Sequence, residues 1–145
     1  MNTYVLDASV AAKWMLPAGG EDLHEEAAEW LERLLGNQIS LVVPDLFWIE
    51  TSNLIWRAVR FGRISGGDGV RALADLRDRD LETVTSIPLL GAALEIAFSY
   101  NRSVYDSIYV ALAKDRSTSL ITADEKLANA VAAYLPVKWL GAFEW

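Results

Sequence analysis

The sequence predicts an α/β fold with a mainly parallel central sheet of four to five strands. Short apolar runs alternate with longer amphipathic stretches along the chain, a pattern typical of strand–helix–strand units. Gly and Pro residues separate many of these segments. Right-handed crossovers between parallel strands place helices on both faces of such a sheet. The length of 145 residues predicts one domain, spanning residues 1–145.

The first elements follow from an apolar start that ends in an acid. Asn2–Asp7 is expected to be a buried strand. Ala8–Leu16 is a short helix, stopped by Pro17. Glu21–Leu35 has apolar residues on one side only, which predicts an amphipathic helix. Ile39–Val43 is the second strand.

The middle of the chain holds two long helices and a weak strand. We expect a helix from about Asp45 to Arg60 and a second over Ser65–Arg79. The surrounding span Ile64–Asp80 is the most polar part of the sequence, so this second helix should be a solvent-exposed excursion. Thr83–Thr85 is a third strand with a weak pattern.

The last third alternates helices with short strands. Helices are predicted over Leu90–Tyr100 and Val104–Arg116. Ser119–Thr122 is the fourth strand, Asp124–Tyr134 a helix and Val137–Leu140 the fifth strand.

Composition excludes several kinds of site. The chain has no Cys and a single His, which removes disulfides, thiolate ligands and a His-rich zinc site. The net charge of −7 argues against nucleic acid, but a cluster of carboxylates that awaits a cation also lowers the net charge. No transmembrane run and no signal peptide is recognisable, so we expect a cytoplasmic protein that does not bind membranes.

Four acids are expected at the carboxyl edge of the sheet, where open parallel sheets bind ligands. Asp7 ends the first strand and Asp124 follows the fourth. The helices that carry Glu50 and Asp106 begin near the same edge. Four carboxylates at one edge would raise one another's pKa values, and a divalent cation would remove this repulsion. Oxygen ligands favour Mg²⁺ or Mn²⁺.

Each acid also has a purely structural explanation. Asp7 could cap the following helix. Asp106 lies three residues after Ser103 in a variant of the capping box, and Asp124 lies inside a capping box that begins at Thr122. Glu50 is harder to explain, because it shares one helical stripe with apolar neighbours and a buried carboxylate needs a partner, either an Arg or a metal. These neighbours are Leu46, Phe47, Leu54 and Ala58.

Four segments together resemble a PIN domain, and more narrowly the toxin ribonucleases of VapBC-type toxin–antitoxin pairs. They read VLDASVAAKWMLP, PDLFWIETSNLIWRAVRFGRIS, SVYDSIYVALAKD and LITADEKL. The resemblance spans essentially the whole chain. It implies an α/β/α sandwich and Mg²⁺- or Mn²⁺-dependent endonucleolytic cleavage of RNA. It also implies a cognate antitoxin as partner and a homodimer or a toxin–antitoxin hetero-oligomer.

The resemblance also assigns site residues. The family's four acids fall on Asp7, Glu50, Asp106 and Asp124. Asp7, Asp106 and Asp124 would contact the metal directly or through water, and Glu50 would hold a metal-bound water or act as a base. The small hydroxyl beside the site falls on Ser9, with Thr122 as a second candidate.

Basic and aromatic residues suggest further surfaces. Lys13, Arg102 and Lys126 lie close in sequence to the acids and are candidates for holding RNA phosphates. Three further basic residues could line one side of the helix that carries Glu50, and the end of that helix: Arg57, Arg60 and Arg63. Ordinary solvated charge also explains each of these residues. A stripe away from Glu50 could be an exposed interface for a partner. It comprises Trp48, Ser52, Ile55, Trp56 and Val59.

Other functions remain open from the residues alone. An aspartyl-phosphate phosphotransferase usually has a second acid two positions after the first, where this chain has Ser9. A receiver-type phosphorylation switch leaves Glu50 and Asp106 unexplained. A catalytically silent PIN-like module that binds a protein or ribonucleoprotein partner would keep the fold without the activity.

Overall fold

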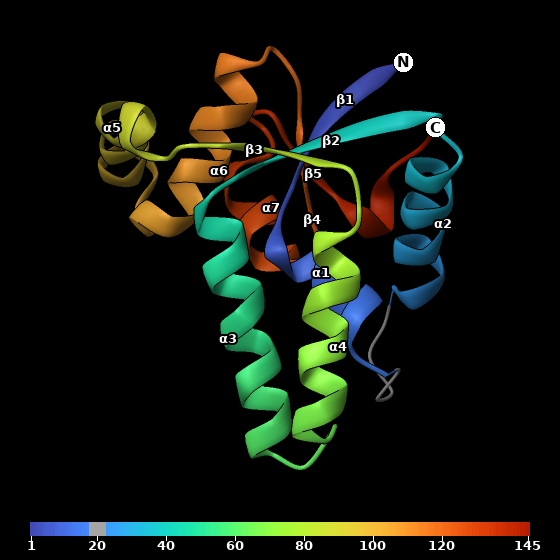
Figure 1. Ribbon diagram of the computed structural model, residues 1–145. Helices are drawn as coiled ribbons and strands as arrows, with labels where there is room; N and C mark the ends of the chain where they lie inside the picture. Colours follow the sequence, from blue (N-terminus) through green and yellow to red (C-terminus); the bar gives the residue numbers. More distant parts are fainter. Residues whose placement is uncertain (18–22) are drawn as a thin grey trace.

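A five-stranded, all-parallel sheet forms the centre of the protein, in the order β3–β2–β1–β4–β5 (Figure 1). The computed structural model describes residues 1–17 and 23–145. The predicted α/β class and strand number are confirmed. The strands are β1 (Asn2–Leu6), β2 (Ile39–Pro44), β3 (Leu81–Val84), β4 (Leu120–Thr122) and β5 (Val137–Trp139).

Helices connect the strands and cover the sheet (Figure 1). Within the described residues, no helix is long and apolar enough to cross a membrane. The α-helices are α1 (Ala8–Met15), α2 (His24–Leu35), α3 (Leu46–Arg60), α4 (Gly66–Arg77), α5 (Leu90–Tyr100), α6 (Val104–Asp115) and α7 (Glu125–Val131). Two short 3₁₀ helices are η1 (Ile87–Leu89) and η2 (Leu140–Ala142).

Most predicted boundaries differ from the structure by one to three residues. The third strand starts at Leu81 rather than Thr83, because it is an edge strand whose side chains are half-buried or exposed and therefore lack a clear apolar run. The last helix ends at Val131, not Tyr134. The helix predicted from Glu21 begins at His24, and Glu21 itself lies outside the described residues.

The central strands are mostly apolar because helices cover both faces of the sheet. Val5 and Leu6 of β1, Val42 of β2 and Leu120 and Ile121 of β4 are completely buried. Each such side chain contributes roughly 1.5–3 kcal/mol through removal of apolar surface from water. The rigid strands therefore hold the residues that follow them in fixed positions.

Helices α3 and α4 lie side by side and extend away from the sheet (Figure 1). The polar span Ile64–Asp80 is helical as predicted, but α4 is not merely a solvent-exposed excursion. Gly69 is buried, and a Cβ atom there would lie 2.8 Å from Ile55 Cγ2 and 3.3 Å from Val59 Cγ2 of α3. A residue without a side chain is needed where the two helices meet this closely.

This helix pair removes most of the predicted exposed stripe. Ile55 is buried and Val59 half-buried under α4, and Trp48 donates its indole N–H to Thr83 Oγ1 at 3.0 Å. Trp56 alone of the five stripe residues is exposed, at 57%. The expectation of an exposed aromatic patch on this side of α3 is therefore wrong.

Candidate functional site

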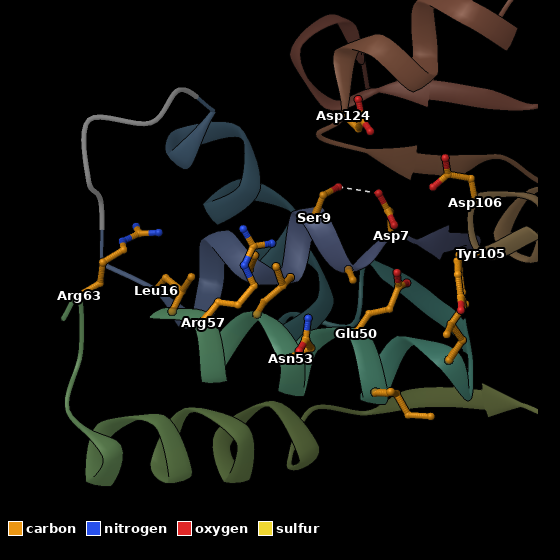
Figure 2. Close-up of a pocket in the computed structure, with 15 residues that line it drawn as sticks. Asp7, Ser9, Leu16, Glu50, Asn53, Arg57, Arg63, Tyr105, Asp106 and Asp124 are labelled. Atoms are coloured by element: carbon orange, nitrogen blue, oxygen red, sulfur yellow. Dashed lines mark hydrogen bonds between the residues drawn. The ribbon is translucent and has the colours of Figure 1, made fainter. Parts of the chain in front are cut away.

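A pocket of about 620 Å³ opens at the carboxyl edge of the sheet (Figure 2). All four predicted acids line it, and each comes from a different part of the fold. Asp7 follows β1, Glu50 lies on α3, Asp106 lies on α6 and Asp124 directly precedes α7. The parallel order of the strands brings together residues that are up to 117 positions apart in the sequence.

Asp7 is held by two hydroxyl groups from different elements. Ser9 Oγ donates to Asp7 Oδ2 at 2.6 Å, and Thr122 Oγ1 donates to the same oxygen at 2.8 Å. The Asp7 side chain accepts no backbone N–H from α1, so the explanation that it caps this helix is wrong. Burial raises the pKa of Asp7, the two hydroxyls oppose this shift, and the charges of Asp106 and Asp124 add to it.

Glu50 has a partner that the sequence did not reveal. Tyr109 Oη of α6 donates to Glu50 Oε1 at 2.6 Å, where we expected an Arg or a metal. Burial is the main cause of the raised pKa of Glu50; the Tyr109 bond lowers this pKa, and Asp7 and Asp106 raise it. Burial, together with the charges of Asp7 and Glu50, strongly raises the pKa of Tyr109, so its hydroxyl stays protonated and donates.

Asp106 lies in the first turn of α6. Its backbone N–H donates to Ser103 Oγ at 3.1 Å, so Ser103 caps the helix as the capping motif predicts. Its carboxylate faces Arg102, with 3.6 Å between Oδ2 and Nη2. Burial raises the pKa of Asp106, Arg102 opposes this shift, and Asp124 adds to it.

Asp124 caps α7 itself. Its Oδ1 accepts the backbone N–H of Leu127 at 3.1 Å, which makes Asp124 and not Thr122 the N-cap residue. The predicted capping box is therefore wrong by two positions. Thr122 ends β4, where its hydroxyl donates to Asp7 and accepts the backbone N–H of Asp124 at 3.0 Å. This hydroxyl thus links two of the four acids.

The basic residues of the pocket are not those proposed from sequence proximity. Lys13 of α1 and Lys126 of α7 are absent from the residues that line it, and Arg102 faces Asp106. Arg57 and Arg63 line it instead. Both were among the basic residues expected along α3 and its end, and Arg57 lies seven residues after Glu50 and therefore on the same face of the helix.

The donor atoms at the acidic end of the pocket suit a hard divalent cation. Carboxylate and hydroxyl oxygens are present there, and the chain's single His is not among the lining residues. The raised pKa values of Asp7, Glu50 and Asp106 show that negative charge is disfavoured, and a cation would reverse this effect. Across the described residues, no three acidic or His side chains already converge as a complete ligand set.

The PIN domain family matches residues 4–132. The chain belongs to this family. The fold and the matched residues agree with the resemblance to a PIN domain that four sequence segments indicate. The four acids also lie at one sheet edge, as this resemblance implies. This PIN domain is also 30% identical over 127 residues to Ribonuclease VapC3 of Pyrobaculum aerophilum, which covers 86% of the chain and 92% of that protein.

Solved structures share the fold at low sequence identity. The crystal structure of PAE2754 from Pyrobaculum aerophilum has a TM-score of 0.72 at 18% identity, covering 96% of this chain and 90% of that one. A toxin–antitoxin complex from Klebsiella pneumoniae has a TM-score of 0.64 at 14% identity, covering 98% and 99%. These likenesses confirm the predicted PIN-like α/β/α architecture.

Proposed function

We propose that this PIN domain is a metal-dependent endoribonuclease, the toxin of a toxin–antitoxin pair. The observation that carries the proposal is the set of four carboxylates that β1, α3, α6 and α7 bring to one pocket. A ribonuclease that is similar over 86% of the chain supports RNA as the substrate. A toxin–antitoxin complex of the same fold supports an antitoxin as the partner.

Asp7, Asp106 and Asp124 would hold Mg²⁺ or Mn²⁺. When bound, such an ion lowers the pKa of water and neutralises charge on a phosphate. Ser9 and Thr122 hold Asp7 in one orientation, because both donate to its Oδ2. This leaves Oδ1 of Asp7 for the cation.

Glu50 accepts a proton from the attacking water in this proposal. Tyr109 occupies Oε1, so the proton goes to Oε2. The raised pKa of Glu50 makes it a stronger base than an exposed carboxylate, which suits proton transfer near neutral pH. The Tyr109 bond also fixes the direction in which Glu50 points.

Cleavage assays test the function directly. Purified protein without partner is incubated with total RNA in Mg²⁺, in Mn²⁺ and in chelator, beside Asp7→Asn and Asp106→Asn. We expect discrete fragments that require the metal and vanish in both variants. Asp115→Asn is the matched control, because Asp115 is an exposed acid at the other end of α6 and does not line the pocket.

Two results of these assays would contradict the proposed function. A folded wild-type protein that cleaves no class of RNA, and whose melting temperature does not respond to Mn²⁺, would be a silent binding module. Cleavage that persists in both variants would place the active site elsewhere. Native mass spectrometry of the same preparation tests the homodimer that the resemblance implies.

A further inference from the structure

Acidic and basic side chains line opposite ends of the pocket. Asp7, Glu50, Asp106 and Asp124 gather at one end, and Arg57 and Arg63 lie at the other (Figure 2). The net charge of the chain is −7, with 13 Lys and Arg against 20 Asp and Glu. Two arginines therefore give one end of the pocket a positive charge that suits an anion, in a chain whose net charge is negative.

We propose that Arg57 and Arg63 form a phosphate subsite for the RNA strand, beside the carboxylates that surround the scissile phosphate. This proposal rests on the proposed nuclease function, and it names the residues that bind the RNA backbone. The subsite takes a phosphate one to three nucleotides from the cut.

Helix α3 sets the distance between the two ends. Glu50 and Arg57 both line the pocket and are seven residues apart, which is two helical turns and about 10 Å along the axis. A stacked strand advances about 3.4 Å per nucleotide, so three nucleotides span this length. An extended strand needs fewer nucleotides. Asn53 lies between the two residues on the pocket wall and is uncharged, so it does not repel the strand.

Guanidinium groups suit this task better than other cations. Their planar fork donates two parallel hydrogen bonds to phosphate oxygens. Arg57 is exposed in the pocket and has no ion-pair partner among the described residues. Arg63 Nη2 donates to the carbonyl oxygen of Pro17 at 3.2 Å, a bond that holds this side chain at the end of the pocket away from the acids.

Binding measurements test the charge contact without cleavage. A fluorescent single-stranded oligoribonucleotide is titrated in chelator at several salt concentrations, with wild type, Arg57→Gln, Arg63→Gln and Arg60→Gln. Each lost phosphate contact lowers the magnitude of the slope of log K against log salt by about 0.7. We expect this loss for Arg57→Gln and for Arg63→Gln, and none for Arg60→Gln. Arg60 is the matched control, because it is exposed on the same helix, lies over the Trp56 ring and does not line the pocket.

Neutral phosphates locate the contact on the strand. Single methylphosphonate substitutions are placed one at a time at each of the three positions on either side of the cut. One position should lower wild-type kcat/KM by roughly 10- to 100-fold, the effect of a charge-assisted hydrogen bond. Arg57→Gln should lose a similar factor on the unmodified strand and should lose nothing further at that position.

The outcomes separate this inference from the proposed function. If wild type cleaves RNA but Arg57→Gln and Arg63→Gln keep its salt slope and kcat/KM, the subsite is refuted and the nuclease stands. The same holds if Arg57→Gln responds to every methylphosphonate as wild type does. If wild type neither binds nor cleaves RNA, both proposals fail.

Discussion

Replacing Asp7 with Asn should stabilise the metal-free protein while it abolishes activity. Both hydroxyl donors to Asp7 reach the same oxygen, Oδ2. An Asn with its amide oxygen in that place keeps both bonds and removes the charge. Burial and the charges of Asp106 and Asp124 disfavour that charge, so its removal should raise the free energy of unfolding. The gain should be on the order of 1 kcal/mol at neutral pH, or about 2–4 °C in Tm.

The pH dependence of this gain has a definite sign. The pKa of Asp7 is higher in the folded protein than its ordinary value of 3.8. The contribution of such a carboxyl to stability is fully present below its unfolded pKa and is lost as the pH rises through its folded pKa. The advantage of Asp7→Asn should therefore appear at neutral pH and shrink as the pH falls toward 4.

Thermal melts in chelator and in Mn²⁺ provide the assay. A metal at 100 times its Kd stabilises the folded state by about 2.7 kcal/mol, so wild type should overtake Asp7→Asn when the metal is present. Glu82→Gln is the control of opposite sign, because Arg116 holds the pKa of Glu82 below its ordinary value; this variant should melt slightly lower. A lower Tm for Asp7→Asn in chelator at pH 7, or an equal response of both proteins to Mn²⁺, would refute the reasoning.

Two further changes probe the site and the fold. Tyr109→Phe removes the donor to Glu50, so the pKa of Glu50 should rise further and the acidic limb of the kcat/KM profile should move to higher pH; an unshifted profile would exclude Glu50 as the base. Gly69→Ala places a Cβ 2.8 Å from Ile55 Cγ2, and this overpacking should cost about 1–3 kcal/mol in chemical denaturation; a stability equal to wild type would show that the α3–α4 contact adapts.

The sequence predicted the convergence of the acids because parallel strands share one carboxyl edge. Asp7 and Asp124 follow adjacent strands, β1 and β4, and the helices of Glu50 and Asp106 begin near that edge. These placements depend only on strand order and on the direction of each helix, and both are readable from alternating apolar and amphipathic segments. The functional roles of these residues remain predictions.

Side-chain pairing could not be predicted in the same way. The Tyr109–Glu50 bond joins residues 59 positions apart, and it depends on how α6 packs against α3. At Thr122 the motif Thr-x-x-Glu fits a capping box, but the strand continues through Thr122 and the helix begins at Glu125. The hydroxyl is therefore available to Asp7, and a local motif does not contain that information.

The prediction of an exposed stripe on α3 was wrong for a related reason. A periodic pattern shows that a helix face is apolar, but not which neighbour covers it. Here the cover is α4, whose polar sequence resembles a solvated helix apart from Gly69 and Leu76, both buried. A single glycine determines how closely the two helices approach, and its meaning becomes visible only when Ile55 is placed opposite it.

Three of the four carboxylates share one arrangement that bears on the proposed metal site. Asp7 is bound through Oδ2, Glu50 through Oε1 and Asp124 through Oδ1, and within the described residues the second oxygen of each has no hydrogen-bond donor. Purely structural carboxylates would gain most from having both oxygens satisfied. Ligands of a cation need one oxygen fixed and the other available. The hydrogen bonds therefore leave one oxygen of Asp7 and one of Asp124 for a cation, and Oε2 of Glu50 for the proton that it accepts. The repulsion among the carboxylates is the energetic cost of holding them together in the absence of the cation.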